Sequence, residues 1–308
     1  MNLLKHNCNI KEWTTSAGNN RLKIQLDNYI PQLVSELKEL EGGKYEGNNL
    51  WTCKDSPRNR FTLDTLSGGE YNGQSKKYIG NVTKYKESPN RDSMWQHQVQ
   101  SFNFKVVRQR CVDAGEMGVG KTLSTIEAVE YFRARWDNAI MWWIAPNSGL
   151  TALRTQIKQW SFKINKGDKL FNYHSLEHQM REAQSPPQIV VFDEIHALKN
   201  SASRRTQLSI SLSIEMERKY GDDCAIIGLT GTPAPEDHFD WWSIAEVIRP
   251  GYLKEASFNK FKYRLASWGT GERFDGGMYP KFLGWKPREV DLLPRRLEGL
   301  VLVTWKKD

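Results

Sequence analysis

Long hydrophobic runs are absent from this sequence. No stretch approaches the roughly 18 consecutive apolar residues that a membrane-spanning helix needs. Residues 1–11 also lack the apolar core of a secretory signal. The sequence therefore excludes a membrane-spanning segment and a secretory leader, and we expect no membrane partner.

Cysteine is scarce as well. The four thiols, Cys8, Cys53, Cys111 and Cys224, are scattered, and no two of them have CxxC spacing. This distribution excludes a disulfide framework and a zinc ribbon. It fits a reducing, intracellular compartment, which would be the cytoplasm in a prokaryote or phage and the nucleus in a eukaryote.

What the chain does have is an ordinary globular composition and a surplus of positive charge. It contains 308 residues, of which 39% are hydrophobic, and its net charge is +8. This length is long for one compact domain and short for three. The charge is compatible with a polyanion partner, although many soluble proteins carry such a surplus without one. Composition alone leaves both interpretations open.

Residues 1–90 show a mixed pattern of short strands and helix. Leu33, Leu37 and Leu40 share one face at helical spacing after Pro31. The composition over 67–90 is rich in Gly, Ser and Asn, which indicates a linker. We expect a small α+β accessory module with a strand near 24–26, a helix from Pro31, a hairpin over 45–51 and a helix over 60–66.

The rest of the chain, residues 91–308, alternates helical segments with short continuous apolar runs. The runs lie at 139–145, 189–192 and 225–229. Such runs are typical of a parallel sheet that helices cover on both faces. The expected fold class is therefore α/β, with 91–308 as the second domain.

One segment of this second domain fits the pattern GxxxxGK[ST]. In such a loop the glycines let backbone N–H groups curl around phosphate oxygens at a helix N-terminus. Lys121 would reach the β- and γ-phosphates of a nucleotide, and the Thr122 hydroxyl would bind Mg²⁺. The residues expected to hold the nucleotide phosphates are Gly115, Glu116, Met117, Gly118, Val119, Gly120, Lys121 and Thr122.

Two further polar segments directly follow apolar runs. Asp193 and Glu194 come after the run at 189–192, which would place their carboxylates at the carboxyl edge of the sheet, where α/β folds bind ligands. Asp193 would hold Mg²⁺, directly or through water, and Glu194 would orient and deprotonate the water that attacks the γ-phosphate. Thr230 begins a Thr-Gly-Thr-Pro segment, which alone would be turn chemistry. The order of the three segments favours a single site for ATP and Mg²⁺.

These three segments resemble motifs I, II and III of superfamily two helicases, specifically the Swi/Snf-type remodeller and translocase ATPases. The resemblance covers residues 95–308, and the Asp-Glu-Ile-His sequence gives motif II the DEAH form. It implies a RecA-like lobe that acts as a DNA-dependent ATPase on double-stranded or branched DNA. Lys121, Asp193 and Glu194 would be its catalytic residues. Gln98 matches the adenine-reading glutamine of the family, and His196 and Thr230 would also lie at the nucleotide.

Other segments resemble the parts of this family that contact DNA. Ala145-Pro146 resembles the start of motif Ia, and the sequence from Tyr173 to Leu176 resembles motif Ib. The paired tryptophans Trp142-Trp143 and Trp241-Trp242 are expected to be core residues. A basic cluster after motif Ia is either a track for the DNA backbone or a solvated face, and it consists of Arg154, Lys158, Lys163, Lys166 and Lys169.

The sequence departs from the family pattern at several positions. Gly115 stands where the family usually has Asp or Glu, and Glu236 stands near the usual position of an Asn. The segment 108–113 before the phosphate loop is unusually polar for a buried strand, which leaves its placement open. The N-terminal module resembles the HARP modules of annealing helicases, which help to recognise branched DNA; the alternative is an appendage of no known type.

Motifs IV to VI of a second RecA-like lobe are not found after Pro233. A missing arginine finger would cost about 10³–10⁵ in rate. We therefore expect the ATP-binding half of a motor, whose second lobe is either another chain or a lost C-terminal half. The alternative is a DNA-binding or regulatory interaction protein that keeps the fold of lobe 1 without turnover. A P-loop kinase is disfavoured by the Thr-Gly-Thr-Pro segment and the extended motif II.

Overall fold

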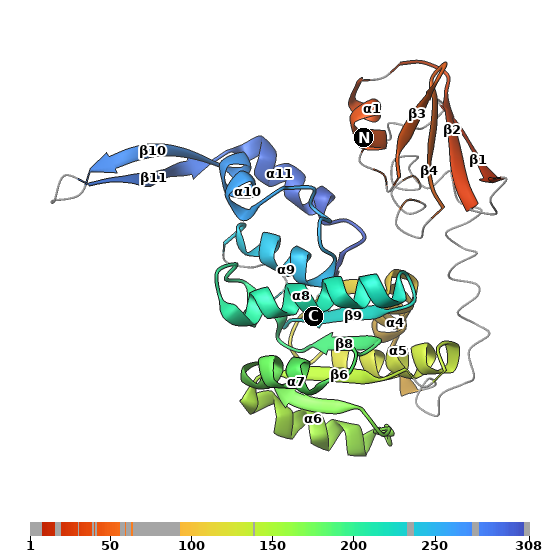
Figure 1. Ribbon diagram of the computed structural model, residues 1–308, viewed down its shortest axis with the longest axis vertical. Coiled ribbons are helices and arrows are strands. Elements are labelled where there is room, and N and C mark those ends of the chain that lie inside the picture. The colour runs from red at the N-terminus through yellow and green to blue at the C-terminus, as the bar shows by residue number, and fades with distance from the viewer. Residues whose placement is uncertain are drawn as a thin grey trace. The chain divides into compact units, whose positions relative to one another are not determined.

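The computed structural model describes residues 8–15, 20–29, 31–38, 40, 42–55, 59, 63, 93–137, 139–232, 237–272 and 277–304. The chain divides into two compact units, Met1–Tyr85 and Lys86–Asp308, whose elements are labelled in Figure 1. The linker expected over 67–90, Pro233, Glu236 and all of the helix expected over 60–66 except Leu63 lie outside the described residues. No helix of the described part is both long and apolar enough to cross a membrane.

In the described part of the first unit, an antiparallel sheet packs against helix α1 (Pro31–Lys38). Leu22, Ile24 and Leu26 alternate with polar residues along their strand and are buried, and they share an apolar cluster with Leu33 and Leu37 of the helix. The strand, helix and hairpin expected here are confirmed, whereas the first strand was not expected. The strand order is β1-β2-β4-β3, with β1 (Cys8–Thr14), β2 (Asn20–Leu26), α1 (Pro31–Lys38), β3 (Lys44–Gly47) and β4 (Leu50–Lys54).

The hairpin between β3 and β4 turns on two asparagines. Asn48 and Asn49 have φ values of 49° and 58°. Asparagine tolerates this left-handed region, which a two-residue hairpin loop of the favoured twist requires at both positions. The local sequence therefore determines this turn, which explains why it could be predicted.

The described part of the second unit contains a six-stranded parallel sheet in the order β12-β5-β9-β8-β6-β7. Its central strands are fully buried and consist almost entirely of apolar residues, as a sheet covered on both faces requires. The expected α/β fold class is confirmed. The strands are β5 (Arg110–Gly115), β6 (Met141–Ala145), β7 (Lys169–Asn172), β8 (Ile189–Phe192), β9 (Ala225–Leu229) and β12 (Val301–Thr304).

The helices of this unit form two groups, one for each face of the sheet. In the first group α4 packs on α5 and α5 on α6; in the second, α7 packs on α8 and α8 on α9. Right-handed crossovers between parallel strands produce such a division. The helices are α4 (Gln96–Arg108), α5 (Lys121–Arg135), α6 (Asn147–Gln159), α7 (Leu176–Glu182), α8 (Arg204–Tyr220) and α9 (Asp240–Ile248), with short 3₁₀ turns at Tyr173–Ser175 and Ile195–Leu198.

The sequence did not predict the elements that follow α9. Helix α10 (Phe258–Leu265) leads into a hairpin of β10 (Ala266–Glu272) and β11 (Met278–Trp285), which projects from the unit in Figure 1, and α11 (Pro287–Arg296) follows. The segment from Val301 returns to the sheet as edge strand β12 and pairs in parallel with β5.

Candidate nucleotide-binding site

The phosphate loop connects β5 to α5, as its sequence pattern requires. Gly118 and Gly120 have φ values of 82° and 79°, which L-residues with a Cβ rarely adopt. A Cβ on Gly120 would also lie only 1.9 Å from Nε2 of Gln98. Lys121 and Thr122 form the first turn of α5, and both are half-buried. The structure thus brings all eight predicted phosphate-binding residues into one strand–loop–helix unit.

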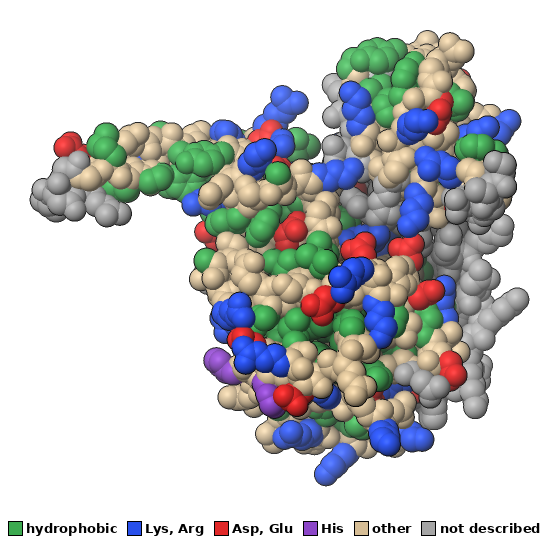
Figure 2. Space-filling model, viewed as in Figure 1, with side chains coloured by type: hydrophobic (Ala, Val, Ile, Leu, Met, Phe, Trp, Pro, Cys, Tyr) green, Lys and Arg blue, Asp and Glu red, His purple; other side chains and the backbone are tan. Residues whose placement is uncertain are grey.

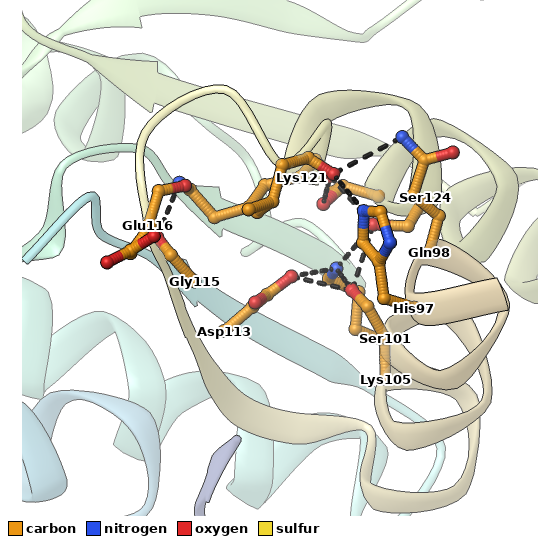
Figure 3. Close-up of polar contacts among 11 residues, drawn as sticks. His97, Gln98, Ser101, Lys105, Asp113, Gly115, Glu116, Lys121 and Ser124 are labelled. Atoms are coloured by element: carbon orange, nitrogen blue, oxygen red, sulfur yellow. Dashed lines mark hydrogen bonds and ion pairs between the residues drawn. The ribbon is translucent and has the colours of Figure 1, made fainter. Parts of the chain in front are cut away.

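Lys121 folds back onto the loop that precedes it. Its Nζ donates hydrogen bonds to the carbonyl oxygens of Gly115 (2.7 Å) and Glu116 (2.9 Å), as Figure 3 shows. Burial lowers the pKa of Lys121, and the nearby carboxylates of Asp113, Glu194 and Asp193 counteract part of this effect. The ammonium is therefore held at the phosphate loop, with the carboxylates of the second motif near enough to influence it.

Gln98 links the start of α4 to the phosphate loop. Its Oε1 accepts from the backbone N–H of Trp95 (2.9 Å), and its Nε2 donates to the carbonyl oxygen of Val119 (3.3 Å). The Nε2 atom of His97 lies 2.8 Å from the same carbonyl oxygen. Both side chains are drawn beside the loop in Figure 3. The predicted adenine-reading residue therefore lies next to the predicted phosphate-binding residues.

A buried polar cluster beneath the loop was missed by the sequence reasoning. Lys105 Nζ lies 2.5 Å from Asp113 Oδ2, 2.5 Å from Ser101 Oγ and 2.8 Å from Ser124 Oγ. Lys105 is 0% exposed and Asp113 is 1% exposed. A charge this deeply buried needs a counter-charge and hydrogen bonds. Lys105 supplies both, which explains how strand β5 can lie buried between β12 and β9 although it contains Asp113.

This cluster joins three elements of the site. Ser101 and Lys105 come from α4, Asp113 from β5 and Ser124 from α5, where the Ser124 hydroxyl also donates to the carbonyl oxygen of Lys121 (2.9 Å). A narrow pocket adjoins it, lined by His97, Gln98, Ser101, Asp113, Val119, Lys121, Ser124 and Thr304. The sequence signal for the cluster was the spacing of Gln98, Ser101 and Lys105 on one face of α4, combined with an aspartate in the next strand.

Asp193 and Glu194 follow β8 at the carboxyl edge of the sheet. Asp193 Oδ1 accepts from the backbone N–H of Glu194 (3.1 Å), and Glu194 Oε2 lies 3.2 Å from His196 Nδ1. Burial raises the pKa of Asp193, and the neighbouring charge of Glu194 raises it further. Glu194 itself has a φ of 51°, a left-handed conformation that directs the chain into the following 3₁₀ turn. The three predicted residues of the second motif thus lie together.

The third motif contacts both of the others. The backbone N–H of Thr230 donates to the carbonyl oxygen of Asp113 (3.1 Å), and the N–H of Gly231 donates to Glu194 Oε2 (3.5 Å). A Cβ on Gly231 would lie 2.9 Å from Cγ of Met117 in the phosphate loop. The three sequence motifs therefore converge on one edge of the sheet.

One of the segments predicted to contact DNA, from Tyr173 to Leu176, contacts this site. Tyr173 donates its hydroxyl hydrogen to the carbonyl oxygen of Asp193 (2.7 Å), which couples motif Ib to motif II. Burial raises the pKa of Tyr173 well above its usual value. In the basic cluster four side chains are exposed, while Lys169 is half-buried with its Nζ 5.1 Å from the ring centre of Trp142. The expectation that Trp142, Trp143 and Trp241 are core residues is confirmed.

Comparisons with known proteins agree with this architecture. No protein-family model matches the chain. The chain is 23% identical over 189 residues to the SWI/SNF-related matrix-associated actin-dependent regulator of chromatin subfamily A-like protein 1 of Bos taurus, and the match covers 56% of this chain and 19% of that protein. It is 24% identical over 182 residues to the nuclear protein STH1/NPS1 of Saccharomyces cerevisiae, covering 53% of this chain and 13% of that protein.

Two solved structures share its fold. They are the SWI2/SNF2 ATPase core of Sulfolobus solfataricus in complex with dsDNA and the ATPase core domain of the same organism, with TM-scores of 0.54 and 0.55 at 20% identity. Each match covers 73% of this chain and 46% of the solved chain. The chain thus spans less than half of the solved cores and less than a fifth of the two relatives. Over the matched part, the chain therefore has the fold of these SWI2/SNF2 ATPase cores.

Proposed function

We propose that this chain is the ATP-binding half of a DNA-dependent ATPase of the double-stranded DNA translocase or helicase type. The observation that carries the proposal is the convergence of three motifs at one edge of the sheet. Lys121 contacts the phosphate loop and Gln98 lies against that loop, while Glu194 accepts a hydrogen bond from Gly231 of the third motif. The RecA-like fold shared with SWI2/SNF2 ATPase cores supports it.

The proposed roles follow from the positions of these residues. Backbone N–H groups from Gly115 to Gly120 and the start of α5 would bind the nucleotide phosphates. Lys121 would leave the loop carbonyl oxygens for the β- and γ-phosphates, so that ATP replaces an internal contact. Gln98 would read the adenine, and His196 and Thr230 would lie at the γ-phosphate end of the site.

Thr122 and Asp193 fit a Mg²⁺ ion by their chemistry. Both offer the hard oxygen donors that Mg²⁺ prefers, and this ion usually takes only one or two protein ligands together with water and substrate phosphates. The described residues contain no group of three or more metal-ligating side chains, so phosphate and water would complete the coordination. When bound, the ion would neutralise charge on the phosphates.

Glu194 is the proposed general base. Its carboxylate lies beside His196 and the Gly231 N–H, where it could accept the proton of a water molecule that attacks the γ-phosphate. Since Glu194 also accepts from the Gly231 N–H, loss of the γ-phosphate could change the position of the third motif. Rotation of one side chain would thus link hydrolysis to the segment that leads into α9.

We further propose that efficient turnover needs a second RecA-like lobe. The chain covers 46% of the solved ATPase cores, and an arginine supplied across the cleft is worth about 10³–10⁵ in rate. The second lobe would be part of another polypeptide or of a longer form of this one. Double-stranded or branched DNA is the proposed polyanion partner because one matched core was solved with dsDNA.

The finer assignments belong to the same proposal. The Asp-Glu-Ile-His sequence is of the DEAH type. Residues 1–90 would be an accessory module that recognises DNA and 91–308 the motor lobe. The location would be intracellular: nuclear in a eukaryote, as the chromatin-related names of the matched relatives suggest, and cytoplasmic in a prokaryote or phage.

The proposal is tested by reconstituting hydrolysis. ATP turnover is measured with this chain alone, with a polypeptide that carries motifs IV to VI, and with both, in the presence and absence of duplex DNA. We expect DNA-stimulated turnover only with both, and none when Lys121→Ala replaces the chain. Robust DNA-dependent turnover by this chain alone would refute the need for a second lobe. If Lys121→Ala retained every biological effect, the chain would instead be a regulatory DNA-binding protein.

A further inference from the structure

The sheet of the first unit has two faces of opposite character. One face is covered by α1 and carries Leu22, Ile24, Trp51 and Cys53, all of them buried. Because side chains alternate along a strand, the neighbours of these residues lie on the other face. That second face, which we call the basic face, carries Lys11 and Trp13 of β1, Arg21 and Lys23 of β2, Lys54 of β4 and Lys44 of β3.

The register places like charges opposite one another on the basic face. Lys11 pairs with Lys23 across β1 and β2, and Arg21 pairs with Lys54 across β2 and β4. Like charges in directly opposite positions destabilise a sheet. The register therefore concentrates positive charge on this face.

Acidic side chains are few in the described part of this sheet. Among the described residues of the four strands, Glu46 lies beside the basic face, where it contacts Lys44 (3.3 Å) and Thr52 (3.1 Å). Glu12 is paired with Leu22, in register with residues that face α1. The basic face thus combines five cations with one carboxylate. Lys and Arg side chains are also prominent on the part of this unit that is visible in Figure 2.

An aromatic ring lies among these cations. Trp13 is 39% exposed, and Lys23 Nζ lies 4.3 Å from its ring centre. Arg21 is held in place by hydrogen bonds to the carbonyl oxygen of Gly42 (2.9 Å) and to Thr52 Oγ1 (3.2 Å). A fixed guanidinium, flanking lysines and a partly exposed indole form the combination that binds sugar-phosphate chains and their bases. A lipid surface would favour several exposed apolar side chains, and among the residues of this face whose burial is described, only Trp13 is a large exposed one.

We propose that the basic face is a nucleic-acid-binding surface, separate from the ATP site, that contacts the phosphate backbone through Lys11, Arg21, Lys23, Lys44 and Lys54. An anionic backbone would offset the positive charges that the register places opposite one another. The proposal rests on the proposed function, because it names the residues with which the accessory module would bind DNA. Binding at the basic face requires neither bound nucleotide nor ATP hydrolysis.

The number of cations sets the expected salt dependence. Each phosphate contact contributes about −0.9 to the slope of log K against log salt on duplex DNA. Neutralising Lys11 and Lys23 together should therefore make the slope of the full chain shallower by about 2. Near 0.1 M salt, the affinity should fall on the order of 10-fold or more.

The test uses the full chain without nucleotide and a fluorescent duplex, with anisotropy measured over a range of salt concentrations. The variants are Lys11→Gln, Lys23→Gln and their combination. Lys38→Gln is the matched control, because Lys38 is an exposed lysine of the same unit that lies on α1. We expect each single variant to make the slope shallower by about 1 and the double variant by about 2, and the control to leave it unchanged. Thermal unfolding should show equal or higher stability for Lys11→Gln, since this variant removes like-charge repulsion against Lys23.

Several outcomes would overturn the proposal. An unchanged slope in the double variant would do so, and so would an equal loss in Lys38→Gln. Competition by vesicles of anionic phospholipid at concentrations that displace the duplex would assign the face to a membrane instead. Lys121→Ala separates this proposal from the ATP site: the variant should lose nucleotide binding but keep the salt slope of the wild type. If no ATP turnover were found but the face variants still made the salt slope shallower, the proposed function would fail and the basic face would remain supported.

Discussion

Removal of Lys105 should be among the most damaging single substitutions in the second unit. The ammonium is fully buried and compensates the carboxylate of Asp113, which lies 2.5 Å away and is also buried. Lys105→Met leaves that carboxylate without its counter-charge in the centre of the sheet, at a cost of about 3–5 kcal/mol in the free energy of unfolding. Asp113→Leu leaves the ammonium in the same position and should cost a similar amount.

The double variant Lys105→Met/Asp113→Leu should recover most of this loss. Replacing a buried ion pair by apolar residues of similar size is often neutral or stabilising by about 1–4 kcal/mol. The remaining hydroxyls keep partners here, because Ser101 Oγ and Ser124 Oγ lie 2.9 Å apart and Ser124 donates to the carbonyl oxygen of Lys121. The double-mutant cycle should therefore show a large favourable coupling between the two positions.

Urea unfolding followed by tryptophan fluorescence measures these effects, since ten of the 12 tryptophans lie in residues 86–308. Lys158→Met serves as the control: Lys158 is exposed on α6, and its loss should change stability by less than about 0.5 kcal/mol. Single variants that cost under about 1 kcal/mol, or a double variant as unstable as the sum of the two, would refute the assignment of a compensating pair.

Three further predictions concern the loop, the metal ligand and a buried thiol. Gly120→Ala should destabilise the second unit by about 1–3 kcal/mol. It should also displace Gln98, so that calorimetric titration shows a lower affinity for ATP. Gly149→Ala is the control, because a Cβ at Gly149 meets nothing closer than 3.7 Å, and it should have little effect. Burial and a neighbouring carboxylate raise the pKa of Asp193 from its usual value of 3.8. Protonation of Asp193 should therefore weaken Mg²⁺-dependent ATP binding as the pH falls, and it should begin at a higher pH than for an ordinary aspartate. An ATP affinity that does not change down to about pH 4 would contradict this. Burial raises the pKa of the Cys111 thiol to about 12, so a thiol-reactive dye should label Cys111 only after unfolding, and rapid labelling of the native protein would show that β5 is more open than described.

Sequence reasoning succeeded where local patterns carry the information. The hairpin over Asn48 and Asn49 depends on two residues that tolerate left-handed backbone. The buried strands β6, β8 and β9 are continuous apolar runs, and the phosphate loop is fixed by glycines at positive φ. Each of these features is determined by neighbouring residues, so no tertiary context was needed to find it.

It failed where distant residues decide the outcome. The sequence could not predict the position of strand β5, because Asp113 is polar. Lys105 from α4 compensates the buried carboxylate of Asp113, and this ion pair is visible only in the folded structure. Edge strand β12 pairs with β5, and the paired residues, such as Val301 and Val112, lie far apart in the sequence. The strands β10 and β11 contain few apolar pairs in alternation, and they are stabilised at their base by rings such as Phe239 and Trp268, whose centres lie 6.0 Å apart. None of these contacts leaves a local pattern.

Equilibrium binding of ATP to this chain alone tests the central claim most directly. Calorimetric or fluorescence titration with ATP and Mg²⁺ should show one saturable site that is lost in Lys121→Ala, because the Nζ that contacts the loop carbonyl oxygens in the free protein is the group proposed to contact the phosphates. Lys158→Met, which changes an exposed side chain of α6, should bind like the wild type. Absence of a saturable site in the wild type, or equal affinity in Lys121→Ala, would contradict the assignment of this lobe as the ATP-binding half of a motor.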